Sequence, residues 1–381
     1  MQTRQNIDLP FEPSKTELSL GVELELQVLD AESLLLTPRA AEIIDQVQRE
    51  NFKKEFFQST LEIVTGICNT VREVETDLER LIQKVHKGSE FLKLRLGSTG
   101  THPLADYRDR LVTPSSRYDE LIDRNQWLIR RMAVYGMHIH IGMISGESCI
   151  RYNYFYMHFL PHIMALSASS PFWQGMDTGL SSCRPTTYEA LPTAGMPYLV
   201  KSWEEFQKLY GFLIQSKAIT SIRDLWWDLR PSPQLGTLEL RFCDEPASLR
   251  EALGIVAFVH VLAHWFRDHE AEWAQSNSTL KHWIFRENKW RALRFGLQAE
   301  IIVSRNGKTK LLSRDIKDWL KILEPYSKQL KYEEYLSVVH EIVEKGNSSD
   351  RQHAIYVKSN DLMEVVKHNV KEFELGFPEW D

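Results

Sequence analysis

Hydrophobic and polar residues alternate strictly along residues 17–30, ELSLGVELELQVLD. Successive side chains of a β-strand point to opposite faces, so this alternation predicts a strand with one apolar face. Four further segments alternate in the same way and are predicted strands: Ser59–Thr65, Gly136–Gly142, Ile222–Arg230 and Thr237–Cys243. The last two are separated by PSPQLG, whose prolines and glycine indicate a hairpin turn.

Other segments repeat their apolar residues at the spacing of an α-helix. This pattern predicts helices at about Arg72–Phe91, Arg117–Val134 and Glu245–Trp273, and only helices beyond Thr309. Within Gly146–Val200, residues 170–197 have no regular period, and a long irregular stretch inside a domain is often functional. The predicted fold class is therefore α+β, with a mainly antiparallel sheet and a helical C-terminal segment.

The polar faces of four predicted strands carry an unusual set of side chains. In each strand the apolar residues occupy one face, so the intervening residues must project together from the other. These residues are Glu23, Glu25, Glu62, His138, His140, Glu239 and Arg241. The sheet would then have helices on one face and a charged concavity on the other.

Two interpretations of these polar faces are open. Any half-solvated antiparallel strand alternates, but surface strands usually mix lysine, threonine and serine among their polar residues. A cluster of glutamates instead needs cations, and Mg²⁺ prefers carboxylate oxygens and bridges substrate phosphates. The pair His138 and His140 also fits a zinc hydrolase of the amidohydrolase type, although the repeated βα units of that fold are absent.

Composition excludes several classes of protein. The 381 residues are 43% hydrophobic, enough for at least one large core, and the formal net charge of −6 gives no electrostatic footprint for nucleic acid. The most apolar stretch, Leu253–Trp265, is interrupted by polar residues and too short to span a bilayer. The N-terminus has no secretory signal, which favours a cytoplasmic location, and the four cysteines are too far apart to suggest a zinc or disulfide motif.

Eight blocks in order resemble the bacterial type 2 glutamate–cysteine ligase (carboxylate–amine ligase) family, whose catalytic domain is related in fold to glutamine synthetase. They are GVELELQVLD at Gly21, LEIVT at Leu61, GTHPLADY at Gly100, GMHIHIG at Gly136, ALSASSPFWQGMDTGLSSCR at Ala165, LPTAGMP at Leu191, WWDLRPSPQLGTLELRFCD at Trp226 and ENKWRALRFG at Glu287.

The resemblance implies a curved sheet with helices on its convex face and a concave face that holds ATP and Mg²⁺, or Mn²⁺. It implies a catalytic domain at 15–308, on which the helical segment 309–381 packs. It assigns metal binding to Glu23, Glu25, Glu62, His138 and Glu239. Arg241 would act with Glu239 in catalysis and contact the ATP phosphates.

Arg184 is a candidate for binding the substrate carboxylate, because a guanidinium matches a carboxylate bidentately, and the equal alternative is an arginine on a surface loop. The expected reaction joins a small carboxylate, glutamate or a similar amino acid, to an amine through an acyl phosphate. Neither a nucleic acid nor a membrane partner is expected, and a homodimer is left open. His140 shares its face with His138 and is expected either to bind the metal or to support its ligands, and no role is derived for His102, Asp228, Arg230 and Arg291.

Two other functions remain open at this stage. One is the metal-dependent hydrolase that uses the two histidines, and the other is a catalytically silent module that binds a nucleotide or an amino acid. Nucleotide dependence separates the ligase from the hydrolase. Retention of all five expected metal ligands argues against the silent module.

Overall fold

The computed structural model describes residues 9–47, 51–277 and 280–380, and its centre is a seven-stranded sheet. The strand order is β10-β11-β5-β1-β3-β2, with β4 also paired to β1, and every pairing in this sheet is antiparallel. The strands are β1 Leu20–Asp30, β2 Phe52–Lys54, β3 Thr60–Val64, β4 Leu94–Gly97, β5 Gly136–Gly142, β10 Leu229–Ser232 and β11 Thr237–Asp244.

The predicted strands account for the centre of this sheet. β1, β3, β5 and β11 form where the alternation placed them, and β10 and β11 form the hairpin predicted from PSPQLG. The prediction of one strand over Ile222–Arg230 is wrong. This segment divides into a 3₁₀ turn (η2, Ile222–Asp224), the short strand β9 (Trp226–Trp227) and β10, and β9 pairs in parallel with β8 (Ala194–Gly195) outside the main sheet.

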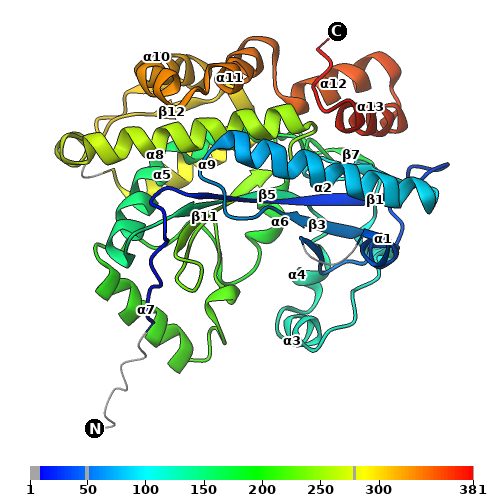
Figure 1. Cartoon of the computed structure of the whole chain (residues 1–381), viewed down its shortest axis with the longest axis horizontal. Helices are drawn as coiled ribbons and strands as arrows, with labels where there is room; N and C mark the ends of the chain where they lie inside the picture. The colour runs from blue at the N-terminus through cyan, green and yellow to red at the C-terminus, as the bar shows by residue number, and fades with distance from the viewer. Residues whose placement is uncertain (1–8, 48–50, 278–279, 381) are drawn as a thin grey trace.

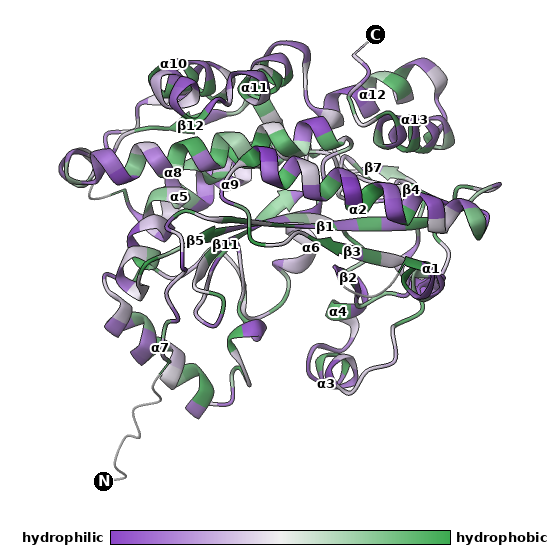
Figure 2. Cartoon of the chain, in the orientation of Figure 1, coloured by the Kyte–Doolittle hydropathy of each residue, from purple (hydrophilic) through white to green (hydrophobic). Residues whose placement is uncertain are grey.

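Helices cover one face of the sheet (Figure 1). The nearest are α2 (Val71–Phe91), α5 (Gly146–Ser167) and α8 (Leu249–Asn277), which pack on the apolar sides of β1, β5 and β11. Their side chains and those of the strands form one large buried core. Figure 2 shows this division, with hydrophobic residues along β1, β3 and α8.

Three predictions about helices need correction. The helix predicted over Arg117–Val134 breaks at Gln126, which has a φ of 50°, into α3 (Ser116–Asn125) and α4 (Trp127–Arg130). The helix α5 was not predicted, because it is buried on almost all sides and so shows no apolar stripe. The helix α8 is long enough to cross a membrane, contrary to the expectation, but 78% of its apolar window is buried, as in a core helix.

The remaining elements lie around this core. A second layer beyond α8 contains α10 to α13 (Figure 1). The hairpin of β12 and β13 precedes these helices, so the chain becomes purely helical at Leu312. The bounds are α1 Ala40–Val47, η1 Tyr107–Asp109, β6 Phe172–Trp173, β7 Met176–Asp177, α6 Arg184–Tyr188, α7 Trp203–Gln215, α9 His282–Phe295, η3 Gly296–Gln298, β12 Glu300–Ile302, β13 Thr309–Leu311, α10 Leu312–Leu330, α11 Glu333–Lys345, α12 Ser348–Ser359 and α13 Leu362–Leu375.

The irregular stretch predicted at residues 170–197 contains only short elements. It is tied to the end of β11 by Asp244, a buried carboxylate that accepts hydrogen bonds from Ser169 N (3.0 Å), Ser170 Oγ (2.7 Å) and Ser182 Oγ (2.9 Å). These bonds bring the start of α6, and with it Arg184, to the start of β5 and the end of β11.

Candidate functional site

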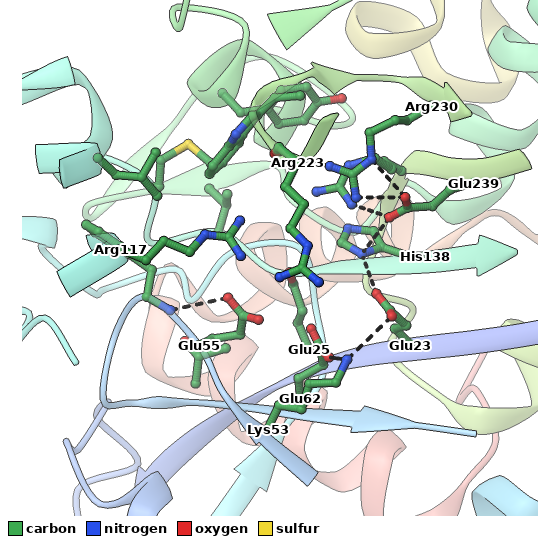
Figure 3. Close-up of a pocket in the computed structure, with 18 of the residues that line it drawn as sticks. Glu23, Glu25, Lys53, Glu55, Glu62, Arg117, His138, Arg223, Arg230 and Glu239 are labelled. Carbon is green, nitrogen blue, oxygen red and sulfur yellow. Dashed lines mark hydrogen bonds and ion pairs between the residues drawn. The ribbon is translucent and has the colours of Figure 1, made fainter. Parts of the chain in front are cut away.

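A cavity of about 470 Å³ opens on the face of the sheet opposite the helical layer. All seven polar side chains that the alternation placed on one face line it: Glu23, Glu25, Glu62, His138, His140, Glu239 and Arg241. Arg184 lines it as well. Figure 3 shows labelled side chains of β1, β3, β5 and the β10–β11 hairpin converging on the cavity, together with Lys53, Glu55, Arg117 and Arg223 from other segments.

One cluster in this cavity surrounds Glu23 and Glu239. His138 Nδ1 lies 3.1 Å from Glu23 Oε2 and 3.9 Å from Glu239 Oε1. His140 Nε2 lies 3.6 Å from Glu23 Oε1 and 3.9 Å from Glu239 Oε1. Cross-strand pairing explains this convergence, since Glu23 is opposite His138 and Glu239 is opposite His140 in the sheet register.

Two arginines hold Glu239 from the other side. Arg230 Nη2 lies 2.7 Å from Glu239 Oε2, and Arg241 Nη1 bonds Oε1. Burial alone would raise the pKa of Glu239, but Arg230 and Arg241 outweigh it and hold that pKa well below the usual range. Glu239 is therefore a buried carboxylate whose ionised form is favoured by its two arginine partners.

Glu23 is kept ionised in a similar way, by the two histidines. Burial pushes its pKa upward, but the hydrogen bond from His138 and the nearby ring of His140 outweigh burial and lower the pKa. The two rings differ: burial and Arg241 lower the pKa of His138 to about 4, whereas Glu239 and Glu23 overcome burial and raise the pKa of His140.

A second cluster contains three carboxylates with the opposite behaviour. Burial, together with the charge of Glu62, raises the pKa of Glu25 to about 7. Burial and neighbouring carboxylates also raise the pKa of Glu62 and of Glu55, a residue not predicted from the sequence. Lys53 Nζ lies 2.7 Å from Glu62 Oε1 and 3.7 Å from Glu23 Oε1, so it joins the two clusters.

These residues fit a hard divalent cation. One oxygen each of Glu23 and Glu239 and one nitrogen of His140 lie within 4.8 Å of one another. His140 Nδ1 bonds Thr237 Oγ1 at 2.9 Å, which leaves Nε2 buried without a hydrogen-bond partner in the described part of the chain. The carboxylates are close enough to raise one another's pKa, and a bound cation would relieve this repulsion. Oxygen and imidazole ligands suit Mg²⁺ or Mn²⁺.

The geometry favours His140 as a metal ligand, whereas the sequence left open whether it binds the metal or only supports the site. Both histidines are within 4 Å of the same two carboxylates. The assignment of His138, Glu23, Glu25, Glu62 and Glu239 as metal ligands remains a prediction, to which His140 is now added.

Arg184 is a buried residue rather than a surface one. Only 5% of it is exposed, and its Nη1 donates to the carbonyl of Arg241 at 3.2 Å. Its Nε has no hydrogen-bond partner, and within the described residues its guanidinium forms no ion pair. A guanidinium that lines a cavity and forms no ion pair within the described residues is suited to bind an anionic ligand.

The outer part of the cavity combines apolar and basic side chains. Tyr118, Leu121, Met132 and Trp226 line one wall and belong to a small hydrophobic cluster. Arg117 and Arg223 also line the cavity, and Figure 3 shows both guanidinium groups directed into it. The cavity can therefore receive an apolar group beside its charged floor.

The residues without a derived role fall into two groups. Arg230 and Asp228 belong to the site or its support: Arg230 binds Glu239, and Asp228 contacts Lys289 and Tyr188. His102 and Arg291 lie elsewhere. His102 contacts the carbonyl of Leu34, and Arg291 pairs with Glu287 on α9.

Comparison with known proteins identifies the family. A family model described as glutamate-cysteine ligase family 2 (GCS2) matches residues 19–368. The chain belongs to this family. A Bdellovibrio bacteriovorus protein provisionally named glutamate–cysteine ligase 2 is 41% identical over 369 residues, which are 96% of this chain and 97% of that protein. A similarly named protein of Thermobifida fusca is 38% identical over 377 residues, covering 97% of this chain and 94% of that one.

Solved structures show that the GCS2 chain shares its fold with more distant ligases. Francisella tularensis glutamate–cysteine ligase, solved in complex with AMP, superposes with a TM-score of 0.67 at 13% identity, over 95% of this chain and 90% of that one. A bifunctional glutathione synthetase from Pasteurella multocida gives a TM-score of 0.62 at 15% identity, over 94% of this chain and 51% of that one. At this identity the likeness concerns the fold alone.

Proposed function

We propose that this chain is an ATP-dependent carboxylate–amine ligase that requires Mg²⁺ or Mn²⁺. One observation carries the proposal: a single cavity collects Glu23, Glu25, Glu62 and Glu239 from three strands, together with two histidines and Arg241. Membership of glutamate-cysteine ligase family 2 and the shared fold of an AMP-bound ligase support it. Glutamate is the first carboxylate donor to test.

Amide formation from a free carboxylate requires that one of its oxygens become a leaving group. Transfer of the γ-phosphoryl group of ATP to that oxygen gives an acyl phosphate and ADP, and attack by the amine then releases phosphate. Bound divalent cations would neutralise the phosphate charges. Glu23, Glu25, Glu62, His138, Glu239 and His140 are the proposed ligands.

The remaining residues have separate proposed roles. Arg241, fixed by its bond to Glu239, presents positive charge to the transferring phosphoryl group. Arg184 binds the donor carboxylate. The polar side of the sheet is proposed as the concave floor of the site in a catalytic domain at 15–308, on which 309–381 packs as a helical segment.

The alternatives fit the structure less well. An amidohydrolase fold requires parallel βα units, whereas every pairing in the main sheet is antiparallel. A silent binding module would not need the complete set of carboxylates, histidines and arginines around one cavity.

Hydroxylamine tests the proposal because it captures an acyl phosphate whatever the physiological amine is. Wild-type protein with Mg-ATP, hydroxylamine and glutamate, then other amino acids and small dicarboxylates, should give a hydroxamate with equal ADP and phosphate. EDTA should abolish all three products. Arg241→Ala should lower them by about 10²–10³-fold, because it removes fixed charge from the transferring group.

Arg291→Ala is the matched control, since Arg291 bonds Glu287 and the carbonyl of Glu300 on the surface, outside the cavity. It should retain wild-type rates. If no carboxylate in the panel yields a hydroxamate, while an amide or ester is hydrolysed in a metal-dependent way, the hydrolase is the better assignment.

A further inference from the structure

The guanidinium of Arg184 is held on three sides. Its Nη1 donates to the carbonyl of Arg241, and the group lies so close to Gly136 that a Cβ there would overlap it. On the third side Cζ lies 5.3 Å from the centre of the Tyr188 ring, a distance at which a cation is attracted to the ring face. Nε is left without a partner. Arg184 is thus restrained before a ligand binds.

The Tyr188 ring is itself restrained from behind the cavity. Its hydroxyl donates to Asp228 Oδ1 at 2.7 Å, and Lys289 Nζ on α9 donates to Asp228 Oδ2 at 2.5 Å. Lys289 also pairs with Glu189, the residue that follows Tyr188. A continuous series of contacts therefore runs from α9 through Asp228 and Tyr188 to Arg184.

The two charged residues of this series do not reach the cavity. Tyr188 and Arg184 line it, but Asp228 and Lys289 are not among its lining residues. Asp228 is fully buried, and Lys289 is 3% exposed. Their side chains do not line the cavity, and Tyr188 is the side-chain partner of Asp228 that does.

A contribution to stability alone does not explain well why Asp228 and Lys289 form a buried ion pair. Removing two charges from water is costly, and well-packed apolar residues often replace a buried ion pair without loss of stability. A hydrogen-bonded carboxylate does provide direction, because it fixes where the Tyr188 hydroxyl and ring must lie. A guanidinium that grips a carboxylate with two parallel bonds depends on that kind of orientation.

We propose that Asp228 and Lys289 are positioning residues that act through Tyr188 to hold the Arg184 guanidinium in the orientation that binds the donor carboxylate. The proposal rests on the proposed function only for the identity of the ligand of Arg184. The positioning itself is a property of the protein without substrate.

Tyr188→Phe is the mildest test, because it keeps the ring and removes only the hydroxyl bonded to Asp228. The KM for the donor in the hydroxylamine assay, with glutamate as the first donor, should rise about tenfold while the KM for ATP stays unchanged. Asp228→Ala should resemble Tyr188→Phe, and Asp228→Asn, which retains an acceptor for Tyr188, should raise the KM for the donor less than Asp228→Ala does. A purely structural role would shift the melting temperature without this selective change in KM.

A double-mutant cycle shows whether the effect passes through Arg184. Tyr188→Phe should have little further effect on donor KM in an Arg184→Ala background. If the effects of the two substitutions on the KM for the donor multiply in the double variant, the proposal is overturned.

The variant of Lys289 is Lys289→Met. If it fails to fold because Asp228 is left without its partner, the double variant Lys289→Met with Asp228→Asn, in which both residues are neutral, is used in its place.

Crystal structures of Tyr188→Phe and of the Lys289 variant give a readout that needs no activity. Movement of the Arg184 guanidinium away from Gly136 supports the proposal, and an unmoved guanidinium in both variants overturns it. If wild-type protein forms no hydroxamate with any donor, the proposed function fails, and these structures still decide the positioning.

Discussion

The guanidinium of Arg184 lies against the main chain of Gly136, at the start of β5. A Cβ on Gly136 would overlap Nη2, Cζ and Nε of that guanidinium. The N–H of the same glycine donates to Glu25 Oε2 at 2.6 Å. The missing side chain thus allows a guanidinium and a carboxylate to reach the same point of the backbone from different directions.

Gly136→Ala should therefore displace Arg184 and weaken binding of the donor carboxylate. We expect the KM for the donor in the hydroxylamine assay to rise about tenfold or more, with a smaller change in the KM for ATP. Gly66→Ala is the matched control, because the nearest atom to a new Cβ there is Asp77 Oδ2 at an ordinary 3.6 Å. Equal kinetics for the two variants would mean that the position of Arg184 does not matter.

The glutamates of the cavity should differ in their effect on stability. Glu239 is 1% exposed and neutralises Arg230 and Arg241, so Glu239→Gln leaves two guanidinium groups without their carboxylate. Breaking a buried pair in this way costs about 3–5 kcal/mol. Glu25 forms no ion pair within the described residues, and burial together with Glu62 raises its pKa more than Arg184 lowers it, so Glu25→Gln should leave the free energy of unfolding unchanged or raise it.

Urea denaturation of both variants in EDTA measures this difference. Both should lose ligase activity, so activity and stability separate at Glu25 and fall together at Glu239. A loss of stability in Glu25→Gln as large as that in Glu239→Gln would show that Glu25 is held by a structural interaction instead.

The raised pKa of Glu25 predicts a pH dependence for the metal-free protein. The pKa is about 7 in the folded chain, against an ordinary value of 4.5, and burial is the main cause. Below pH 4.5 both states are protonated and the contribution to stability is complete. As the pH rises toward 7, the unfolded chain loses its proton first, so stability falls until the folded carboxyl also ionises.

Melting temperatures in EDTA between pH 5 and 8 test this dependence. The advantage of Glu25→Gln over wild type should grow as the pH rises and level off above about pH 7, where Glu25 has ionised in both states. Added Mn²⁺ should reduce the difference, because a bound cation stabilises the ionised carboxylate. Parallel curves for the two proteins would contradict the raised pKa.

Alternation revealed most of the site because every member of its floor lies on a regular strand. Glu23, His138 and Glu239 each follow a period of two, which fixes their face of the sheet without any knowledge of strand order. The register that places Glu23 opposite His138 is a property of the assembled sheet. For that reason the choice between His138 and His140 could not be made from spacing.

Residues outside this period were missed. Lys53 lies in β2 and Glu55 directly follows it, and this strand of three residues is too short to show a pattern. Arg184 was suggested by its residue type, but its burial depends on Asp244 and Ser170, which are distant in sequence. The helix α5 was not predicted because the periodic pattern of apolar and polar residues disappears when a helix is buried on almost all sides.

The two histidines provide the last prediction. A cation between Glu23 and Glu239 would be within reach of His138 Nδ1 and of His140 Nε2, since each lies within 4 Å of an oxygen of both carboxylates. We expect His138→Asn and His140→Asn each to weaken Mn²⁺ binding, measured by calorimetry, by about tenfold or more. His353→Asn, on the surface beside Asp177, is the control and should bind Mn²⁺ like wild type.

The comparison of the two variants also assigns the ligand. Loss of a ring that binds the metal directly should lower the affinity for Mn²⁺ more than loss of a ring that only orients a carboxylate. It should also change the electron paramagnetic resonance spectrum of bound Mn²⁺. Wild-type affinity in His138→Asn would remove His138 from the ligand set and leave Glu23, His140 and Glu239 as the cation site. Wild-type affinity in both variants would mean that no cation binds between Glu23 and Glu239, and the metal would then have to lie at Glu25, Glu55 and Glu62.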